Sequence, residues 1–294
     1  MKNPSKIATV IKTICAVLVF GAGLVFFLYP AISSVVNERT QVKVISNYEQ
    51  AIAALSEEEH ARSLEQAKLY NQALEGNQDS ISDPFDSSAI RGEAEANEVV
   101  SVLTAGEVMG YIQIPRIGIK SPIYQGTAEV SLQNGIGWLE GTSLPVGGES
   151  THTVLTGHRG LPTAKLFTDL EKIERNDEFY IKNSSEILAY RVFEIEVIDP
   201  GDVDALTIVT GKDRATLLTC HPYMVNSHRL LVKGERIPYI GQLDELADSD
   251  DLFANLSAAQ RDLLTSGLAS LLFVGIAVGL VLLMRHRRKK REEG

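Results

Sequence analysis

The sequence predicts a mostly β domain, an antiparallel barrel or sandwich, preceded by N-terminal helices and flanked by two transmembrane helices. Residues 99–240 consist of short runs rich in β-branched and aromatic residues, separated by Gly, Pro, Asn and Asp, without long helices between them. A long apolar run lies on each side of this region. The 294 residues are 44% hydrophobic and 22% charged, which excludes a disordered or collagen-like chain, and two cysteines exclude a disulfide framework.

The two apolar runs, residues 13–29 and 263–284, contain no charged residue. Each is long enough to cross the hydrocarbon core of a bilayer, about 30 Å thick, as a helix. Basic residues lie at the outer end of each run: Lys2, Lys6 and Lys12 before the first, and Arg285, Arg287, Arg288, Lys289, Lys290 and Arg291 after the second. Because basic flanks stay in the cytoplasm, we expect both termini there and residues from about 31 to 262 on the extracellular face of the cell membrane.

The first run also fits a cleaved signal peptide, because Ala-Ile-Ser at residues 31–33 is an acceptable small-residue cleavage site. Residues 1–30 are therefore expected to form an anchor or a signal, and residues 263–284 a C-terminal transmembrane helix with a basic cytoplasmic tail at 285–294. The formal net charge of −10 argues against a nucleic-acid partner, because binding to phosphate needs a basic surface.

A helical segment, residues 31–75, follows the first apolar run. Apolar residues recur at helical spacing in residues 34–55 and again in residues 57–74. Ser56 and Glu59, three positions apart, fit a capping box, in which each side chain accepts a hydrogen bond from the other residue's backbone N–H. The sequence therefore predicts that the second helix begins just after Ser56.

The polar stretch at residues 76–98 predicts a long loop. Long irregular loops on a compact domain tend to be lids or linkers. Asp83, Pro84 and Phe85 stand out within it, because no surrounding apolar pattern would bury the aromatic side chain. We expect this segment to be a lid loop.

The β-rich domain, residues 99–240, contains seven predicted strands. They are residues 109–114, 119–124, 153–157, 178–181, 187–198, 214–220 and 229–237. Residues 161–170 predict a short helix between two of the strands. The acidic residues that follow, 241–262, predict a connector to the second membrane helix.

Three residue types that acyl transfer requires lie at the ends of predicted strands. Cys220 ends one strand, Arg229 begins the next, and His158 follows another in a glycine-flanked turn. A hairpin brings Cys220 and Arg229 to one end of the barrel, and His158 joins them if its strand is adjacent. A thiol supplies a nucleophile, an imidazole transfers protons near neutral pH, and a guanidinium donates to an oxyanion. Because Cys15 lies in the first apolar run, Cys220 is expected to be an unpaired thiol.

These motifs resemble the sortases, the cysteine transpeptidases of Gram-positive cell surfaces. The resemblance covers roughly residues 99–240, and Thr-Gly-His combined with Thr-Leu-Leu-Thr-Cys and an arginine nine positions later is highly specific. It implies the sortase eight-stranded β-barrel, with Cys220 as the nucleophile, His158 as the general acid/base and Arg229 as the oxyanion stabiliser. No cofactor or metal is implied. One departure is Met224, which stands in the loop after the cysteine where the family usually has a glycine, and it leaves the conformation of that loop open.

Residues 135–143, the Asp-Pro-Phe motif and the C-terminal membrane helix resemble class C, the pilin-polymerising sortases. That resemblance implies a lid in which Asp83 engages Arg229 and Phe85 covers Cys220. It also implies a reaction in which the thiol cleaves an LPXTG-like sorting signal, forms a thioacyl-enzyme and transfers the threonine carboxyl to a lysine amine. The partners are then pilin subunits that carry such signals and an acceptor lysine, at the membrane.

Other interpretations of the same residues stay open. A housekeeping sortase that anchors proteins to the cell wall would use the same three residues, and a non-enzymatic surface β-domain would leave Cys220 inert. A papain-like protease fits poorly, because the cysteine lacks that family's local signature. His152 and His221 lack the spacing of zinc ligands. Trp138 is expected to serve packing, and His228 to be a hydrogen-bonded or solvated neighbour of the arginine.

Overall fold

The computed structural model describes residues 4–74, 81–85, 108–241, 265–267 and 269–270. Its helices are α1 (Pro4–Ala53), α2 (Glu57–Leu74) and α4 (Glu129–Asn134), with the 3-10 helices η1 (Pro115–Ile117), η2 (Leu166–Lys172) and η3 (Val203–Leu206). Its strands are β1 (Val108–Ile114), β2 (Ile119–Tyr124), β3 (Ile136–Trp138), β4 (Thr151–Thr156), β5 (Glu178–Lys182), β6 (Ile187–Ile198), β7 (Asp213–His221) and β8 (His228–Ile237).

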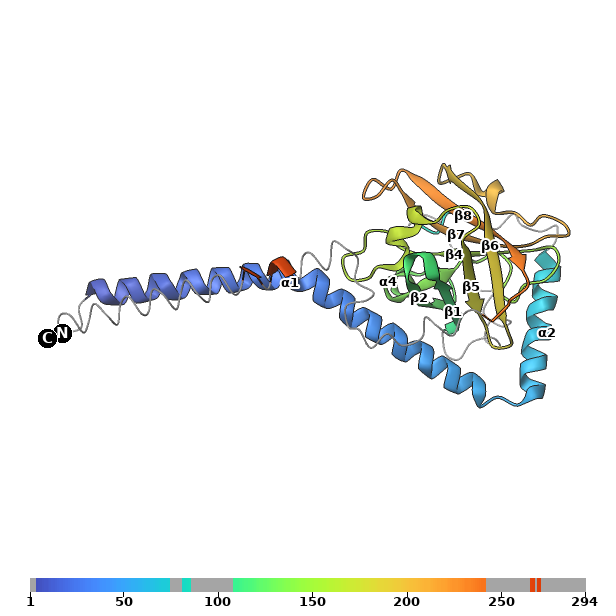
Figure 1. Cartoon of the computed structure of the whole chain (residues 1–294), viewed down its shortest axis with the longest axis horizontal. Helices are drawn as coiled ribbons and strands as arrows, with labels where there is room; N and C mark the ends of the chain where they lie inside the picture. Colours follow the sequence, from blue (N-terminus) through green and yellow to red (C-terminus); the bar gives the residue numbers. More distant parts are fainter. Residues whose placement is uncertain (1–3, 75–80, 86–107, 242–264, 268, 271–294) are drawn as a thin grey trace. The chain divides into compact units, whose positions relative to one another are not determined.

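The eight strands form a closed barrel in the order β1-β2-β3-β4-β7-β8-β6-β5 (Figure 1). The prediction of a mostly β barrel is confirmed, as are the seven predicted strands within a few residues at each end. Six of the eight strand pairs are antiparallel, whereas β2–β3 and β4–β7 are parallel. The parallel β4–β7 pair matters for the site, because two parallel strands end at the same end of the barrel.

The sequence pattern does not predict β3 and α4, and it gives the wrong bounds for the helix at residues 161–170. Strand β3 has three residues with Gly137 at its centre, so it is too short for a period-two pattern. A Cβ at Gly137 would lie 2.6 Å from the carbonyl oxygen of Gly126, and this close approach accounts for the glycine. Residues 161–165 are turn and irregular backbone, and the helical segment is η2.

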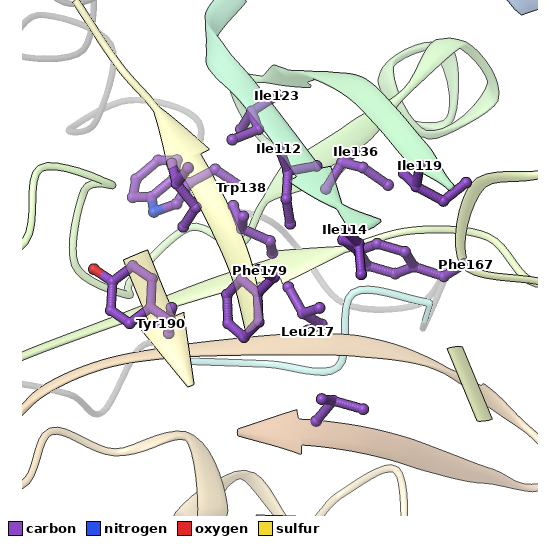
Figure 2. Close-up of a cluster of buried hydrophobic side chains, with 14 of the residues drawn as sticks. Ile112, Ile114, Ile119, Ile123, Ile136, Trp138, Phe167, Phe179, Tyr190 and Leu217 are labelled. Carbon is purple, nitrogen blue, oxygen red and sulfur yellow. The ribbon is translucent and has the colours of Figure 1, made fainter. Parts of the chain in front are cut away.

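Aromatic and branched aliphatic side chains from many strands fill the barrel (Figure 2). Phe179 and Tyr190, on the adjacent strands β5 and β6, stack with ring centroids 5.5 Å apart. Trp138 is fully buried, and its indole N–H donates a hydrogen bond to the backbone oxygen of Ser143 over 2.9 Å. The expectation that Trp138 serves packing is confirmed.

Helix α2 packs on the barrel through its buried residues Ala67 and Asn71. The side chain of Asn71 donates to the backbone oxygen of Leu144 over 3.2 Å and accepts from its backbone N–H over 2.7 Å, as a neighbouring strand would. At the start of the helix, Ser56 N–H donates to Glu59 Oε2 over 2.8 Å, and Glu59 N–H donates to Ser56 Oγ over 3.3 Å. The predicted capping box is confirmed.

Helix α1 contains both the first apolar run and nearly all of the predicted helix at residues 34–55. The sequence patterns indicate two separate helices, whereas the structure has one continuous helix with Pro30 inside it. Within the described residues, the part of α1 from Cys15 to Ala53 includes an 18-residue window with a mean hydropathy of 2.3. It is long and apolar enough to cross a membrane, a test that a signal sequence also passes. Residues 265–267 and 269–270 are helical. The rest of the second apolar run, the basic tail and residues 242–262 of the connector lie outside the described residues.

Candidate active site

Cys220 and Arg229 stand directly opposite each other across the β7–β8 hairpin. Cys220 is the second-last residue of β7 and Arg229 the second residue of β8, so both lie at the end of the barrel where the hairpin loop begins. They are 7% and 6% exposed. The predicted juxtaposition of these two residues at one end of the barrel is therefore present in the structure.

His158 reaches the same end of the barrel through the parallel pairing of β4 with β7, in which Thr156 is opposite Leu218. Two threonine hydroxyls join the ends of these strands. Thr156 Oγ1 donates to the backbone oxygen of Leu218 over 3.3 Å, and Thr219 Oγ1 donates to that of Gly157 over 2.7 Å. The threonines of both sequence motifs thus fix the turn that carries His158 against the strand that carries the thiol.

Gly157, between Thr156 and His158, is required by close packing. A Cβ at this position would lie 2.6 Å from Ile136 Cδ1 and 2.9 Å from a ring carbon of Phe167. The backbone N–H of Phe167 donates to the backbone oxygen of His158 over 3.1 Å. The histidine is therefore held by its backbone between β3 and η2.

Four hydrogen bonds orient the guanidinium of Arg229. Its Nη1 donates to the backbone oxygens of Asn226, over 3.0 Å, and His228, over 2.9 Å. Its Nε and Nη2 donate to the two carboxylate oxygens of Asp83, over 2.8 and 2.5 Å. Arg229 is thus fixed on one side by the β7–β8 loop and on the other by the lid.

The segment predicted to be a lid, which is described over residues 81–85, lies on these side chains. The ring centroid of Phe85 is 5.6 Å from that of His158 and 5.3 Å from Arg229 Cζ. The structure therefore contains the expected Asp83–Arg229 contact, and Phe85 lies against the histidine and the arginine. That Phe85 covers Cys220 stays a prediction. Ile81 is buried in an apolar cluster with Leu218 and other barrel residues, so the lid is also anchored in the core, which its polar composition did not indicate.

Burial raises the pKa of the Cys220 thiol above its ordinary value. The guanidinium of Arg229 lowers this pKa, the carboxylate of Asp83 raises it, and the guanidinium of Arg159 lowers it. Asp83 thus opposes the stabilisation of the thiolate by the arginine that it binds. With Asp83 in place, the net effect of burial and the neighbouring charges favours the thiol over the thiolate.

Arg159 is a buried residue of the site that the sequence analysis missed. Its side chain is 1% exposed and forms an ion pair with Glu171. Its Nη1 lies 3.1 Å from Nδ1 of His221, the residue that follows the nucleophile candidate, and its Cζ lies 5.6 Å from the ring centroid of Tyr223. The sequence feature that could have identified Arg159 is its position between His158 and Gly160, in the turn that carries the histidine.

The remaining histidines have other partners. Nδ1 of His152 lies 2.8 Å from the backbone oxygen of Thr207, and Nε2 lies 2.7 Å from Thr216 Oγ1. Burial lowers the pKa of His152 to about 4, so it is neutral near pH 7. His228 is half-exposed, with Asp199 3.5 Å away, as expected of a hydrogen-bonded or solvated neighbour.

The structure gives the backbone conformation of Met224, the residue that stands where the family usually has a glycine. Its φ is +64°, in the left-handed region that favours glycine, and Asn226 two residues later has a φ of +62°. The β7–β8 loop therefore keeps a glycine-like turn although a methionine occupies the position.

Comparisons with known proteins converge on one family. The sortase domain model matches residues 112–237. The crystal structure of sortase C-1 from Streptococcus pneumoniae is 46% identical, covers 67% of this chain and 100% of that chain, and has a TM-score of 0.63. A pilus-related sortase C of Group B Streptococcus is 46% identical, covers 65% of this chain and 95% of that chain, and has a TM-score of 0.61. Sortase D of Bacillus subtilis is 27% identical over 135 residues, which are 45% of this chain and 65% of that relative's length.

Proposed function

The chain belongs to the sortase family, in its class C group, and we propose that it is a membrane-bound cysteine transpeptidase that assembles pilins. It would cleave an LPXTG-like sorting signal after the threonine and join the threonine carboxyl to a lysine amine of the next pilin subunit. The pilus-related relative supports the choice of pilins as substrates.

In the proposed first step, the thiolate of Cys220 attacks the threonyl carbonyl. A tetrahedral intermediate forms, and the planar guanidinium of Arg229 donates to its oxyanion. The carbon–nitrogen bond then breaks, and His158 gives a proton to the leaving amine. A thioacyl-enzyme remains, and the lysine amine of a second subunit attacks its carbonyl in the next step.

The observation that carries this proposal is the position of the three side chains. Cys220 and Arg229 are cross-strand partners, and the parallel strand β4 brings His158 to the same end of the barrel. The proposed nucleophile, proton carrier and charged donor therefore lie at one end of the barrel.

The lid in this structure would represent the closed, resting enzyme. Asp83 occupies the two donors of Arg229, Nε and Nη2, that an oxyanion would use, and Phe85 lies against His158. Substrate binding would then require the lid to leave. The Asp83 carboxylate is, in this interpretation, a stand-in for the oxyanion of the reaction.

The test compares the full chain with its Cys220→Ala variant in detergent, using a sorting-signal peptide as acyl donor and a pilin domain as acceptor. Mass analysis should find a lysine isopeptide with the native chain and none with the variant. Cys15→Ala, which removes the other free thiol, is the matched control and should retain activity. Cleavage by Cys220→Ala within tenfold of wild type would exclude the nucleophile. Transfer to a cell-wall peptide in place of the pilin lysine would indicate a housekeeping sortase.

A further inference from the structure

Glu129, the first residue of α4, places a carboxylate beside the imidazole of His158. Its Oε1 lies 3.6 Å from His158 Nε2, and the Glu129 side chain is 66% exposed. The Nε2 atom is itself buried and has no hydrogen-bond partner among the described residues. Gln133, one helical turn further on, donates from Nε2 to Glu129 Oε1 over 2.8 Å and so restrains the carboxylate. An exposed carboxylate therefore lies beside an imidazole nitrogen that makes no hydrogen bond among the described residues.

The partners of Glu129 distinguish it from two other carboxylates at this site. Asp83 is bound by the guanidinium of Arg229, and Glu171 by that of Arg159. The described contacts of Glu129 are with the neutral amide of Gln133 and with the imidazole. Its negative charge is thus available to a cation from outside the barrel, whereas the charges of the other two are already neutralised.

We infer that Glu129 and His158 together form the seat for the ammonium group of the acceptor lysine, which makes Glu129 a specificity-determining residue for a primary alkylammonium. This inference rests on the proposed transpeptidase function. Once the lid has left, Asp83 no longer neutralises Arg229, and this guanidinium beside the thiol would repel a positively charged acceptor. The exposed carboxylate of Glu129 would offset that repulsion, because an ammonium binds carboxylate oxygens through charge-assisted hydrogen bonds.

The proton balance of the second step gives both groups a role. The lysine ammonium, held by Glu129, first loses one proton to His158 Nε2, which passes it to solvent. The free amine then attacks the thioacyl carbon, a carbon–nitrogen bond forms and the carbon–sulfur bond breaks. The second amine proton passes through His158 to the sulfur of Cys220. The products are an amide, a thiol and one released proton.

The experiment measures partitioning of the thioacyl-enzyme of the full chain between two acceptors at pH 7.5, with a sorting-signal peptide as donor. One acceptor is Nα-acetyl-lysine amide, which carries an ammonium, and the other is hydroxylamine, which is uncharged at this pH. For Glu129→Gln we expect KM for the lysine compound to rise about fivefold, which is the factor that an exposed ion pair provides. The ratio of lysine transfer to hydroxylamine transfer should fall by the same factor. Glu129→Asp should keep part of the ratio. Added salt should lower it in wild type more than in Glu129→Gln.

Asp199→Asn is the matched control, since Asp199 is also an exposed carboxylate beside an imidazole, that of His228, at 3.5 Å. Its ratio should equal that of wild type. An unchanged ratio in Glu129→Gln would overturn the inference. An equal loss with both acceptors would also overturn it, because Glu129 would then act only on the imidazole. If the wild-type chain released no glycine-containing fragment from the donor peptide, the proposed function itself would fail, which is a distinguishable result.

Discussion

Replacing Asp83 with alanine should open the lid and expose Cys220 to small thiol reagents. In the structure the Asp83 carboxylate and the Arg229 guanidinium are joined by two hydrogen bonds, and their side chains are 9% and 7% exposed. Alanine removes both bonds and leaves the arginine without its carboxylate in the closed state. The closed state should therefore lose stability relative to the open state, in which Arg229 meets water.

The structure sets the magnitude. A hydrogen bond to a charged group contributes about 1.5 to 3 kcal/mol, and each 1.4 kcal/mol changes an equilibrium about tenfold. If the two bonds of this one carboxylate–guanidinium pair are counted together as one such contribution, its loss raises the open population roughly 10- to 100-fold. Ile81 stays packed in its apolar cluster, so the substitution releases residues 83–85 more than the lid as a whole. The labelling rate should increase by the same factor as the open population.

The assay is the rate of alkylation of Cys220 by iodoacetamide, in a Cys15→Ala background so that one thiol reacts. Ser82→Ala is the matched control, because Ser82 is the exposed neighbour of Asp83 in the lid. It should label at the wild-type rate. Equal labelling of Asp83→Ala and wild type would show that the lid contact does not limit access to the sulfur, and the closed-lid interpretation would be wrong.

The pH dependence of labelling separates charge from access. The carboxylate of Asp83 raises the pKa of the Cys220 thiol, so its removal should lower that pKa. The pH at which labelling reaches half of its maximal rate should then fall. Phe85→Ala also removes a contact of the lid but keeps the carboxylate. It should therefore raise the labelling rate with a smaller shift along the pH axis. A shift of the same size in both variants would assign the effect to burial alone.

Three further outcomes are expected. Arg229→Lys should lower kcat/KM about 100-fold or more, since an ammonium cannot donate as a planar fork, whereas Arg236→Lys on the same strand should stay near wild type in the same peptide-cleavage assay. Burial lowers the pKa of His152 to about 4 from an ordinary 6.5, so the stability from its neutral form is present above pH 6.5 and is lost as the pH falls towards 4. In urea unfolding, the free energy of unfolding of wild type should fall by about 3 kcal/mol over this pH range because of His152, and that of His152→Gln should not show this decrease. Met224→Gly, at φ +64° and 71% exposed, should raise the free energy of unfolding by up to about 1 kcal/mol, whereas Val225→Gly should lower it; a decrease in both would contradict backbone strain.

The sequence was sufficient for most of the strands and for the pairing of Cys220 with Arg229 because each leaves a local pattern. Seven strands were long enough to show β-rich runs between turn residues, and Cys220 and Arg229 stand at the ends of two of them. A hairpin has one local pairing, so the partnership of these two residues follows from the chain. The position of His158 required the parallel β4–β7 pair, which is not local, and only the family resemblance supplied it in advance.

The parts that the sequence did not predict depend on contacts between distant segments. Arg159 and Glu129 are ordinary charged residues in sequence, and their importance comes from what η2, β7 and His158 place beside them. The anchoring of Ile81 has the same origin, because a single isoleucine in a polar stretch gives no periodic signal. Strand β3 is too short for any pattern to identify it.

In the proposed mechanism, the same geometry serves catalysis and inhibition. Nη1 of Arg229 donates to the backbone oxygens of Asn226 and His228, so we expect Nε and Nη2 to keep their direction when Asp83 leaves. A carboxylate that binds those two donors copies the charge and position of the oxyanion, and a lid that carries it competes directly with the transition state. When the lid opens without substrate, water replaces the Asp83 carboxylate at Nε and Nη2 of Arg229. When it opens with substrate bound, the oxyanion of the intermediate replaces that carboxylate. Closure in the resting state and stabilisation of the intermediate therefore depend on one side chain, and a mutation that weakens Arg229 should relax the lid as it slows the chemistry.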